Sequence, residues 1–321
     1  MLLPNSTYHP EFLFKNSHFN TIYRTLFQNL KIIFSRKRME LEDGDFIDLD
    51  FSTVYSDKIV IAIHGLEGSS NSNYIKSLTN ILNVNNFDVM VINLRGCSGE
   101  LNRLLSSYHS GKTDDLNKVI NYLTANYSYT EINLVGFSLG GNMILKYLGE
   151  KLFNIHTKIK YAVAISAPCD LQGSSIELSK FWNRIYMQRF LISLKKKLNV
   201  KAKQFPNSFL DIGKIENAQN FFDMDNLYTA PAHGFKDAVD YWEKNSSKQF
   251  IPNIKTPTLL ITSQDDPFLS RSCIPIKEAK NNSDFTLELT NYGGHVGFNT
   301  SFSRANNHWL ENRIVEFLRN S

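Results

Sequence analysis

Residues 135–141 read Val-Gly-Phe-Ser-Leu-Gly-Gly, and this stretch decides the fold. It follows a short apolar run at 131–135 and precedes a helical pattern at 142–149. A serine at a tight strand-to-helix turn sits in a strained backbone conformation, and side chains two residues to either side of it would collide. Glycine at both of those positions removes the collision. The pattern predicts a nucleophile elbow that exposes Ser138 at the carboxyl edge of a sheet, next to a helix N-terminus that favours negative charge.

Strand and helix patterns alternate along most of the chain. A hairpin is expected at 37–52, and amphipathic helices are expected at 73–83, 113–125 and 306–318. Buried or half-buried strands are expected at 58–63, 87–94, 131–135, 161–166, 258–262 and 285–290. Strands that alternate with helices predict an α/β fold, with a mostly parallel central sheet flanked by helices and joined by right-handed crossovers.

The alternation stops at 169–250, where helical patterns at 176–198 and 235–244 occur without a strong strand. We interpret this block as a helical cap inserted over the carboxyl edge of the sheet. Residues 1–35 are rich in aromatic side chains, which are costly to expose, so we expect an N-terminal arm packed on the body. Residues 1–321 then form a single domain with an insertion.

Composition narrows the class of protein. Hydrophobic residues make up 42% and charged residues 21% of the 321 residues, as in an ordinary globular protein. The net charge of +4 is too small to indicate a surface that binds nucleic acid. The cysteines, Cys97, Cys169 and Cys273, are too few and too scattered for a disulfide framework or a metal site, which favours a cytoplasmic location. No signal peptide and no apolar run of about 20 residues is found, so we expect no integral membrane segment.

A serine hydroxyl is a poor nucleophile at neutral pH, so it needs a base and a group that orients the base. In this architecture the chain order is serine, acid, histidine. The loop after the expected strand at 285–290 holds His295, which follows two glycines. We therefore predict that His295 acts as general base and then as general acid for Ser138.

The orienting carboxylate is expected in the loop after the strand at 258–262. Asp265 and Asp266 both lie there, and Pro267 restricts Asp266 to an extended backbone. We predict Asp266 as the acid of the triad. Asp265 is the close alternative, and Asp170, after the preceding strand, is the distant one.

Two backbone N–H groups are expected to form an oxyanion hole. One belongs to Leu139, directly after the nucleophile. The other is assigned to Leu66, in the loop that follows the strand at 58–63, where His64 is expected to brace the loop. This chemistry requires no metal and no organic cofactor.

Six blocks carry a resemblance to a known family. They are HGLEGSSNS (64–72), NLRGCSGELNR (93–103), YHSG (108–111), GFSLGGNM (136–143), DDPF (265–268) and GGHVGF (293–298). With them the chain resembles the α/β-hydrolase superfamily, and more narrowly its YheT-like branch, the AB hydrolase 4 family. The resemblance implies a serine hydrolase that cleaves small-molecule carboxylic esters with short to medium acyl chains. It carries the triad over to Ser138, Asp266 and His295.

Other functions fit parts of the same pattern. An acyltransferase or a thioesterase would use the same triad, and a hydrolase-like scaffold without turnover would share the fold. His109 and Asp114 form an H-x-x-x-x-D string of the kind found in acyltransferases. The expected cap is rich in aromatic residues that suggest an apolar acyl site, namely Phe181, Trp182, Tyr186, Phe190, Phe205, Phe209, Phe221 and Phe222.

Overall fold

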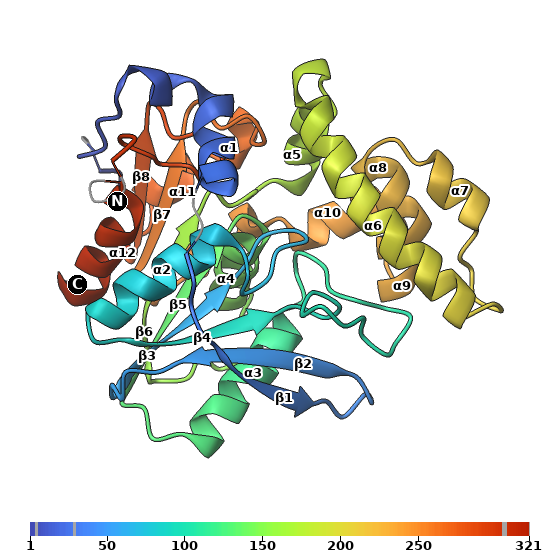
Figure 1. Ribbon diagram of the computed structural model, residues 1–321, viewed down its shortest axis with the longest axis horizontal. Coiled ribbons are helices and arrows are strands. Elements are labelled where there is room, and N and C mark those ends of the chain that lie inside the picture. Colours follow the sequence, from blue (N-terminus) through green and yellow to red (C-terminus); the bar gives the residue numbers. More distant parts are fainter. Residues whose placement is uncertain (4–5, 28–29, 304–306, 321) are drawn as a thin grey trace.

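The computed structural model describes residues 1–3, 6–27, 30–303 and 307–320 (Figure 1). Within them one eight-stranded sheet has the order β1-β2-β4-β3-β5-β6-β7-β8. The strands are β1 Ser35–Glu40, β2 Phe46–Ser52, β3 Lys58–Ile63, β4 Asp88–Asn93, β5 Glu131–Phe137, β6 Ile159–Ile165, β7 Thr258–Ser263 and β8 Phe285–Thr290. The pairs β1–β2 and β2–β4 are antiparallel and all other pairs are parallel, which confirms the predicted mostly parallel sheet.

Helices cover both faces of the sheet. Those of the body are η1 Phe12–Lys15, α1 Ser17–Phe27, α2 Asn73–Val84, α3 Thr113–Asn126, α4 Leu139–Gly149, η5 Arg271–Cys273, α11 Ile276–Lys280 and α12 Trp309–Asn320. The predicted closing helix thus begins at Trp309, and residue 306 lies outside the described residues.

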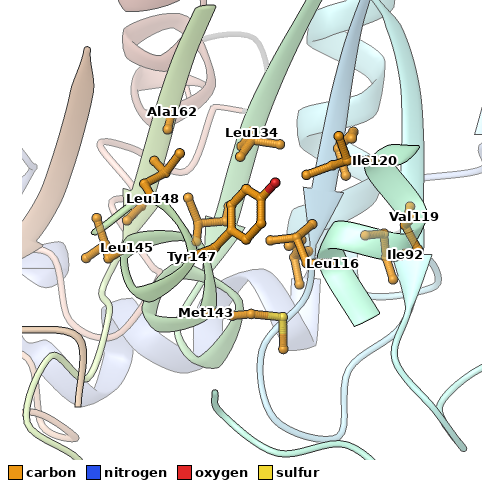
Figure 2. Close-up of a cluster of buried hydrophobic side chains, with 14 of the residues drawn as sticks. Ile92, Leu116, Val119, Ile120, Leu134, Met143, Leu145, Tyr147, Leu148 and Ala162 are labelled. Atoms are coloured by element: carbon orange, nitrogen blue, oxygen red, sulfur yellow. The ribbon is translucent and has the colours of Figure 1, made fainter. Parts of the chain in front are cut away.

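Side chains alternate between the two faces along β3. Ile59, Ile61 and Ile63 join the core under α3 and α4, whereas Val60 and Ala62 join the core under α2 and α12. Figure 2 shows the first core, where side chains of α3 and α4 meet those of β4, β5 and β6. The continuous apolar run in the sequence is therefore explained by a strand buried on both faces.

A helical insertion, residues 171–253, joins β6 to β7 and stands beside the sheet, at the right of Figure 1. Its helices are α5 Leu171–Leu178, η2 Phe181–Asn183, α6 Arg184–Gln204, α7 Ile212–Asn217, α8 Phe221–Met224, the π-helix η3 Asp225–Thr229, α9 Ala230–His233, α10 Ala238–Asn245 and η4 Ser247–Asn253. It has its own apolar cluster, in which Met187, Leu191 and Leu198 of α6 pack on Ile215 and Met224.

The prediction of one helix over 176–198 is wrong, because the chain breaks between α5 and α6. The break has a polar anchor in Asn183, whose side chain is fully buried. Its amide donates hydrogen bonds to the carbonyl oxygens of Glu177, at 3.0 Å, and Pro267, at 2.5 Å. These bonds replace the helical ones and tie the turn to the loop after β7.

The N-terminal residues lie along the edge of the sheet that is formed by β8. Leu2 forms a parallel bridge with Leu287 of β8, and Tyr8 packs on Trp309 of α12. Arg24 of α1 forms a buried ion pair with Glu311. No helix among the described residues is long and apolar enough to cross a membrane.

The tight turn between β5 and α4 predicts that one added methyl group, at Gly140, strongly destabilises the fold. A Cβ at Gly140 would overlap the carbonyl oxygen of Ile63 at the end of β3. We expect Gly140→Ala to lower the free energy of unfolding by about 2 kcal/mol or more, measured by urea denaturation. Gly213 of α7 is exposed, and a Cβ there would meet only the Oδ1 atom of Asp211, at 3.3 Å, so Gly213→Ala is the control and should change stability far less. Equal effects of the two substitutions would contradict this account of the turn.

Candidate active site

Ser138 lies at the junction of β5 and α4. Its backbone has φ 51° and ψ −116°, a strained conformation for a residue with a side chain. Its N–H donates a 2.7 Å hydrogen bond to the carbonyl of Ile165 at the end of β6, and its carbonyl accepts from the N–H of Asn142. The turn is therefore fixed from both sides, and the hydroxyl is held at the carboxyl edge of the sheet, as the sequence predicts.

The loops after β7 and β8 bring two further side chains to Ser138. The Nε2 atom of His295 lies 3.0 Å from the Oγ atom of Ser138. The Nδ1 atom of the same ring lies 3.0 and 3.1 Å from the two carboxylate oxygens of Asp266. Because a carboxylate only accepts, Nδ1 donates to Asp266, and Nε2 is left to accept the proton of the Ser138 hydroxyl.

The surroundings of Asp266 and His295 are largely dry. Asp266 is buried and accepts a 2.8 Å hydrogen bond from the N–H of Phe268. The ring of Phe268 stacks on the imidazole of His295, with the ring centroids 4.2 Å apart. A packed aromatic ring on one side and a carboxylate on the other leave the imidazole little freedom to rotate.

The two alternative carboxylates have other partners. Asp265 accepts a 3.0 Å hydrogen bond from the N–H of Gly294, and burial raises the pKa of its carboxyl. Asp170 caps α5 by accepting from the N–H of Gly173 at 3.0 Å. Of the three aspartates considered from the sequence, only Asp266 meets the ring of His295 in the part of the chain that the structure describes.

Residues of α1 hold the histidine loop, a role that sequence reasoning missed. The Oγ1 atom of Thr21 accepts a 2.9 Å hydrogen bond from the N–H of His295. The buried side chain of Asn20 accepts from the N–H of Asn299 at 3.0 Å. From the sheet side, Ser166 accepts from the N–H of Val296 at 3.1 Å. These partners are more than 120 positions away along the chain. The only signal for Asn20 and Thr21 is that polar residues interrupt an aromatic segment, and the sequence gives no signal for Ser166.

The loop after β3 presents one unused backbone donor beside Ser138. The N–H groups of Gly65, Glu67 and Gly68 donate to the Tyr74 hydroxyl, the Tyr108 hydroxyl and the Gly65 carbonyl. Among the described residues, the N–H groups of Leu66 and Leu139 have no protein acceptor. Both leucines line the same cavity as Ser138 and His295. The arrangement can therefore stabilise an oxygen anion near Ser138.

His64 is fully buried and braces this loop, as expected. Its Nδ1 atom donates to the carbonyl of Gly65 at 2.7 Å, and its Nε2 atom accepts from the N–H of Leu94 at 3.1 Å. Both bonds require the neutral ring. Burial lowers the pKa of His64 to about 4, which keeps the ring neutral over the physiological range.

A cavity of about 140 Å³ extends from Ser138 and His295 into the helical insertion. Of the eight aromatic residues named from the sequence, Phe190 and Phe221 line it, together with Leu178, Met224 and Trp242. By contrast Phe181, Trp182, Phe209 and Phe222 are exposed. The suggestion that all eight form an apolar site was therefore too broad, because half of them point to solvent.

A second hollow, a groove of about 480 Å³, reaches the same serine from another side. It runs between α1 and α6 and is lined by polar residues such as Thr21, Asn73, Arg189 and Ser193. His18 and Tyr186 join the two helices, with their rings stacked at 5.7 Å. Ser138 thus stands between an apolar cavity and a more polar groove.

Residues of the remaining sequence blocks, among them Arg95, Tyr108 and His109, line the same cavity as Ser138. Arg95 is buried and pairs with Asp115 at 2.6 Å and Asp45 at 3.1 Å. Asp114 pairs with Lys112 at 2.7 Å, and in the described residues no hydrogen bond or ion pair joins it to His109. The H-x-x-x-x-D string therefore does not form a catalytic pair here. Among the same residues, no group of His, Cys, Asp or Glu is arranged to hold a metal ion.

Comparison with known proteins identifies relatives that match most of the chain. Residues 58–300 match a family model described as the alpha/beta hydrolase fold. The chain is 34% identical to the Escherichia coli K12 protein named "Putative esterase YheT", over 95% of this chain and 91% of that one. It is 30% identical to a monoacylglycerol lipase of Saccharomyces cerevisiae, over 81% of this chain and 59% of that one.

Solved structures agree on the architecture. The esterase Pf2001 of Pyrococcus furiosus has a TM-score of 0.60 at 17% identity, covering 91% of this chain and 94% of that one. An esterase of Exiguobacterium antarcticum has a TM-score of 0.54 at 18% identity, covering 88% and 97%. At these identities the likeness shows the fold alone. Together the comparisons confirm the fold class and the family resemblance predicted from the sequence.

The hydrogen bond from the N–H of His295 to Thr21 joins the loop at 293–298 to α1, and it leads to a prediction. Thr21→Val keeps the shape of the side chain but leaves the N–H of His295 without its acceptor. An unpaired buried donor costs about 1–2 kcal/mol, so the free energy of unfolding should fall by that amount and amide exchange at 293–298 should accelerate. Thr21→Ser retains the hydroxyl and serves as the control. If Thr21→Val exchanges as slowly as the native chain, α1 does not hold this loop.

The buried ring of His64 predicts a loss of stability in acid. The pKa of His64 is about 4 in the folded chain and 6.5, the usual value, in the unfolded chain. Between pH 4 and pH 6.5 the unfolded chain therefore binds more protons than the folded chain. Stability is complete above pH 6.5 and falls as the pH drops toward 4, by about 3 kcal/mol in total from this group. NMR titration of the labelled ring should give a midpoint near 4. A midpoint near 6.5 would rule out the buried neutral ring.

Proposed function

This chain belongs to the α/β hydrolase family, as a member of esterase type, and from that premise we propose that it cleaves small-molecule carboxylic esters through Ser138, His295 and Asp266. One observation carries the proposal, the continuous hydrogen-bond chain from the Ser138 hydroxyl through both nitrogens of His295 to the Asp266 carboxylate. The order and spacing of these three side chains support the roles of nucleophile, base and orienting group in acyl transfer to serine.

The first half of the reaction forms an acyl-enzyme. The Oγ atom of Ser138 attacks the ester carbonyl carbon while Nε2 of His295 takes the hydroxyl proton. The charged imidazole that results is stabilised by the Asp266 carboxylate on its other nitrogen. Negative charge develops on the former carbonyl oxygen, and the free N–H groups of Leu66 and Leu139 stabilise it. The dipole of α4, whose first residue is Leu139, acts in the same direction.

The second half releases both products. His295 gives its proton to the leaving alcohol oxygen as the bond from carbon to that oxygen breaks, which leaves the acyl group on Ser138. A water molecule then attacks the acyl carbon, and His295 takes one of its protons. Collapse of this second intermediate returns the proton to Ser138 and frees the carboxylic acid. No step in this sequence requires a metal or an organic cofactor.

The two hollows beside Ser138 suggest how the ester is oriented. We place the acyl chain in the 140 Å³ cavity, because its walls carry Leu178, Phe190 and Met224. The alcohol part then lies in the groove between α1 and α6, where hydroxyl, amide and guanidinium groups are available. We take the acyl chain to be of short to medium length, as the family resemblance implies.

A reducing, cytoplasmic location is also part of the proposal. All three cysteines are buried free thiols in the structure. Burial raises the pKa of Cys97 to about 12, so this thiol stays protonated and does not compete with Ser138 as the nucleophile.

Kinetics of variants on p-nitrophenyl butyrate test the mechanism. Ser138→Ala should lower kcat by about 10⁴-fold or more, because attack on the ester then has no nucleophile. Asp266→Asn should lower kcat by about 10³-fold or more, because the imidazole loses the group that fixes its tautomer. Asp265→Asn is the matched control at the neighbouring position and should cost less than about tenfold.

Two results would contradict the assignment. Full activity of a folded Ser138→Ala variant would remove the nucleophile from the proposal. A greater loss in Asp265→Asn than in Asp266→Asn would exchange the roles of the two aspartates. Unfolding curves of each variant establish that the comparison is made between folded proteins.

A further inference from the structure

An unusual apolar surface lies where the helical insertion turns from η2 into α6. The side chains of Phe181, Trp182, Ile185 and Ile192 are 83%, 61%, 81% and 67% exposed. They line one shallow hollow together with Arg184 and Arg189. Exposed apolar side chains that stand singly are normal, but a contiguous group of this kind marks a surface that meets something apolar. We refer to it as the α6 patch.

The patch is the outer face of a helix whose inner face is already packed. Met187, Leu191 and Leu198 of α6 are buried in the apolar cluster of the insertion. Ile185 and Ile192 are seven positions apart, two turns of the helix, so they share one face. Packing of the insertion therefore does not account for them, and their exposure is not a consequence of the helix lying loosely on the body.

The same helix is strongly cationic. Its 21 residues include seven lysines and arginines and no aspartate or glutamate. Lys197 pairs with Glu67, and Lys201 is buried. In the described part of the chain, no carboxylate lies within ion-pair distance of Arg184, Arg189 or Lys196, and all three are exposed.

Apolar side chains and unpaired cations are therefore mixed on one exposed surface. A bilayer that carries anionic lipids offers the complementary surface, with anions above hydrocarbon. Trp and Phe side chains partition well into the head-group region of such a bilayer, while arginine and lysine bind the phosphates.

The position of the patch relates it to the candidate active site. Arg189 lines both the hollow of the patch and the groove that reaches Ser138. In Figure 1 the turn between α5 and α6 projects at the top of the view, on the same side as α1, the other wall of the groove. A surface bound at the patch would lie at the mouth of that groove.

We propose that the α6 patch binds the surface of membranes that contain anionic lipids. Phe181, Trp182 and Ile185 insert among the head groups, and Arg184, Arg189 and Lys196 bind lipid phosphates. Membrane binding in this form does not depend on the proposed ester hydrolysis. It would place the groove where an ester can leave the bilayer for Ser138.

Cosedimentation of the full chain with lipid vesicles tests this inference. Vesicles of phosphatidylcholine with about 30 mol% phosphatidylglycerol should bind the protein at least about tenfold more tightly than pure phosphatidylcholine vesicles. Salt at about 0.5 M should reduce the difference, since it screens the charges on both surfaces. Fluorescence of Trp182, which is far more exposed than Trp242, should shift to shorter wavelength on binding.

Variants separate the apolar and the charged contributions. Phe181→Ser/Ile185→Ser should lower binding to the anionic vesicles by about tenfold or more. Arg184→Gln/Lys196→Gln should remove most of the preference for anionic over zwitterionic vesicles. The control is Tyr55→Ser/Val84→Ser, which removes side chains that are 97% and 77% exposed near the opposite edge of the sheet, and it should bind as the native chain does.

Hydrolysis of dissolved p-nitrophenyl butyrate reports separately on folding and on the proposed chemistry. It should be unchanged in all three double variants, because none of the substituted residues lines the cavity or the groove at Ser138. Vesicle binding with no hydrolysis would leave this inference standing and overturn the proposed function alone.

Three outcomes would overturn the inference. The first is the absence of binding to the anionic vesicles, and the second is equal binding by the native chain and by Phe181→Ser/Ile185→Ser. The third is a stable dimer in analytical ultracentrifugation that is absent in the same double variant, since the patch would then be covered by a second copy of the chain.

Discussion

The close approach of α4 to the end of β3 is the contact on which the rest of the site depends. At Gly140 the helix backbone lies against the carbonyl of Ile63, and at Gly136 the strand lies against the backbone of the helix's first turn. This proximity forces the chain to turn within one residue, and Ser138 absorbs the turn with a positive φ. It also brings the loop at 64–68 beside Ser138, so the positions of Ser138 and of the free N–H of Leu66 arise from one packing constraint.

Around this rigid centre, three segments that are remote in sequence fix the other groups. The arm holds the backbone of the histidine loop through Thr21. The helical insertion reaches the loop at 64–68 through Lys197, which pairs with Glu67 at 2.8 Å. The carboxylate of Glu67 also accepts a 2.7 Å hydrogen bond from the hydroxyl of Tyr108. Glu67 directly follows Leu66, whose N–H is free. The insertion therefore contributes to the position of this loop as well as to the walls of the cavity.

Much of this arrangement could be predicted from the sequence, and the reason is local. The strand at 58–63 and the strand at 285–290 have the predicted bounds, because apolar runs next to polar turns are unambiguous. The positions of Ser138, His295 and Asp266 followed from the rule that parallel strands end at one edge. The break at Asn183 and the role of Thr21 could not be predicted, because both depend on hydrogen bonds to loops far away along the chain.

Covalent labelling of Ser138 is the most direct measurement of whether this site is a working one. A fluorophosphonate reacts with a serine only when a base activates the hydroxyl and an oxyanion hole receives the phosphoryl oxygen. Mass spectrometry of the digested protein should find the adduct stoichiometrically on the peptide that contains Ser138, and prior unfolding should abolish it. A folded chain that remains unlabelled, or that carries the adduct on another serine, would contradict the account.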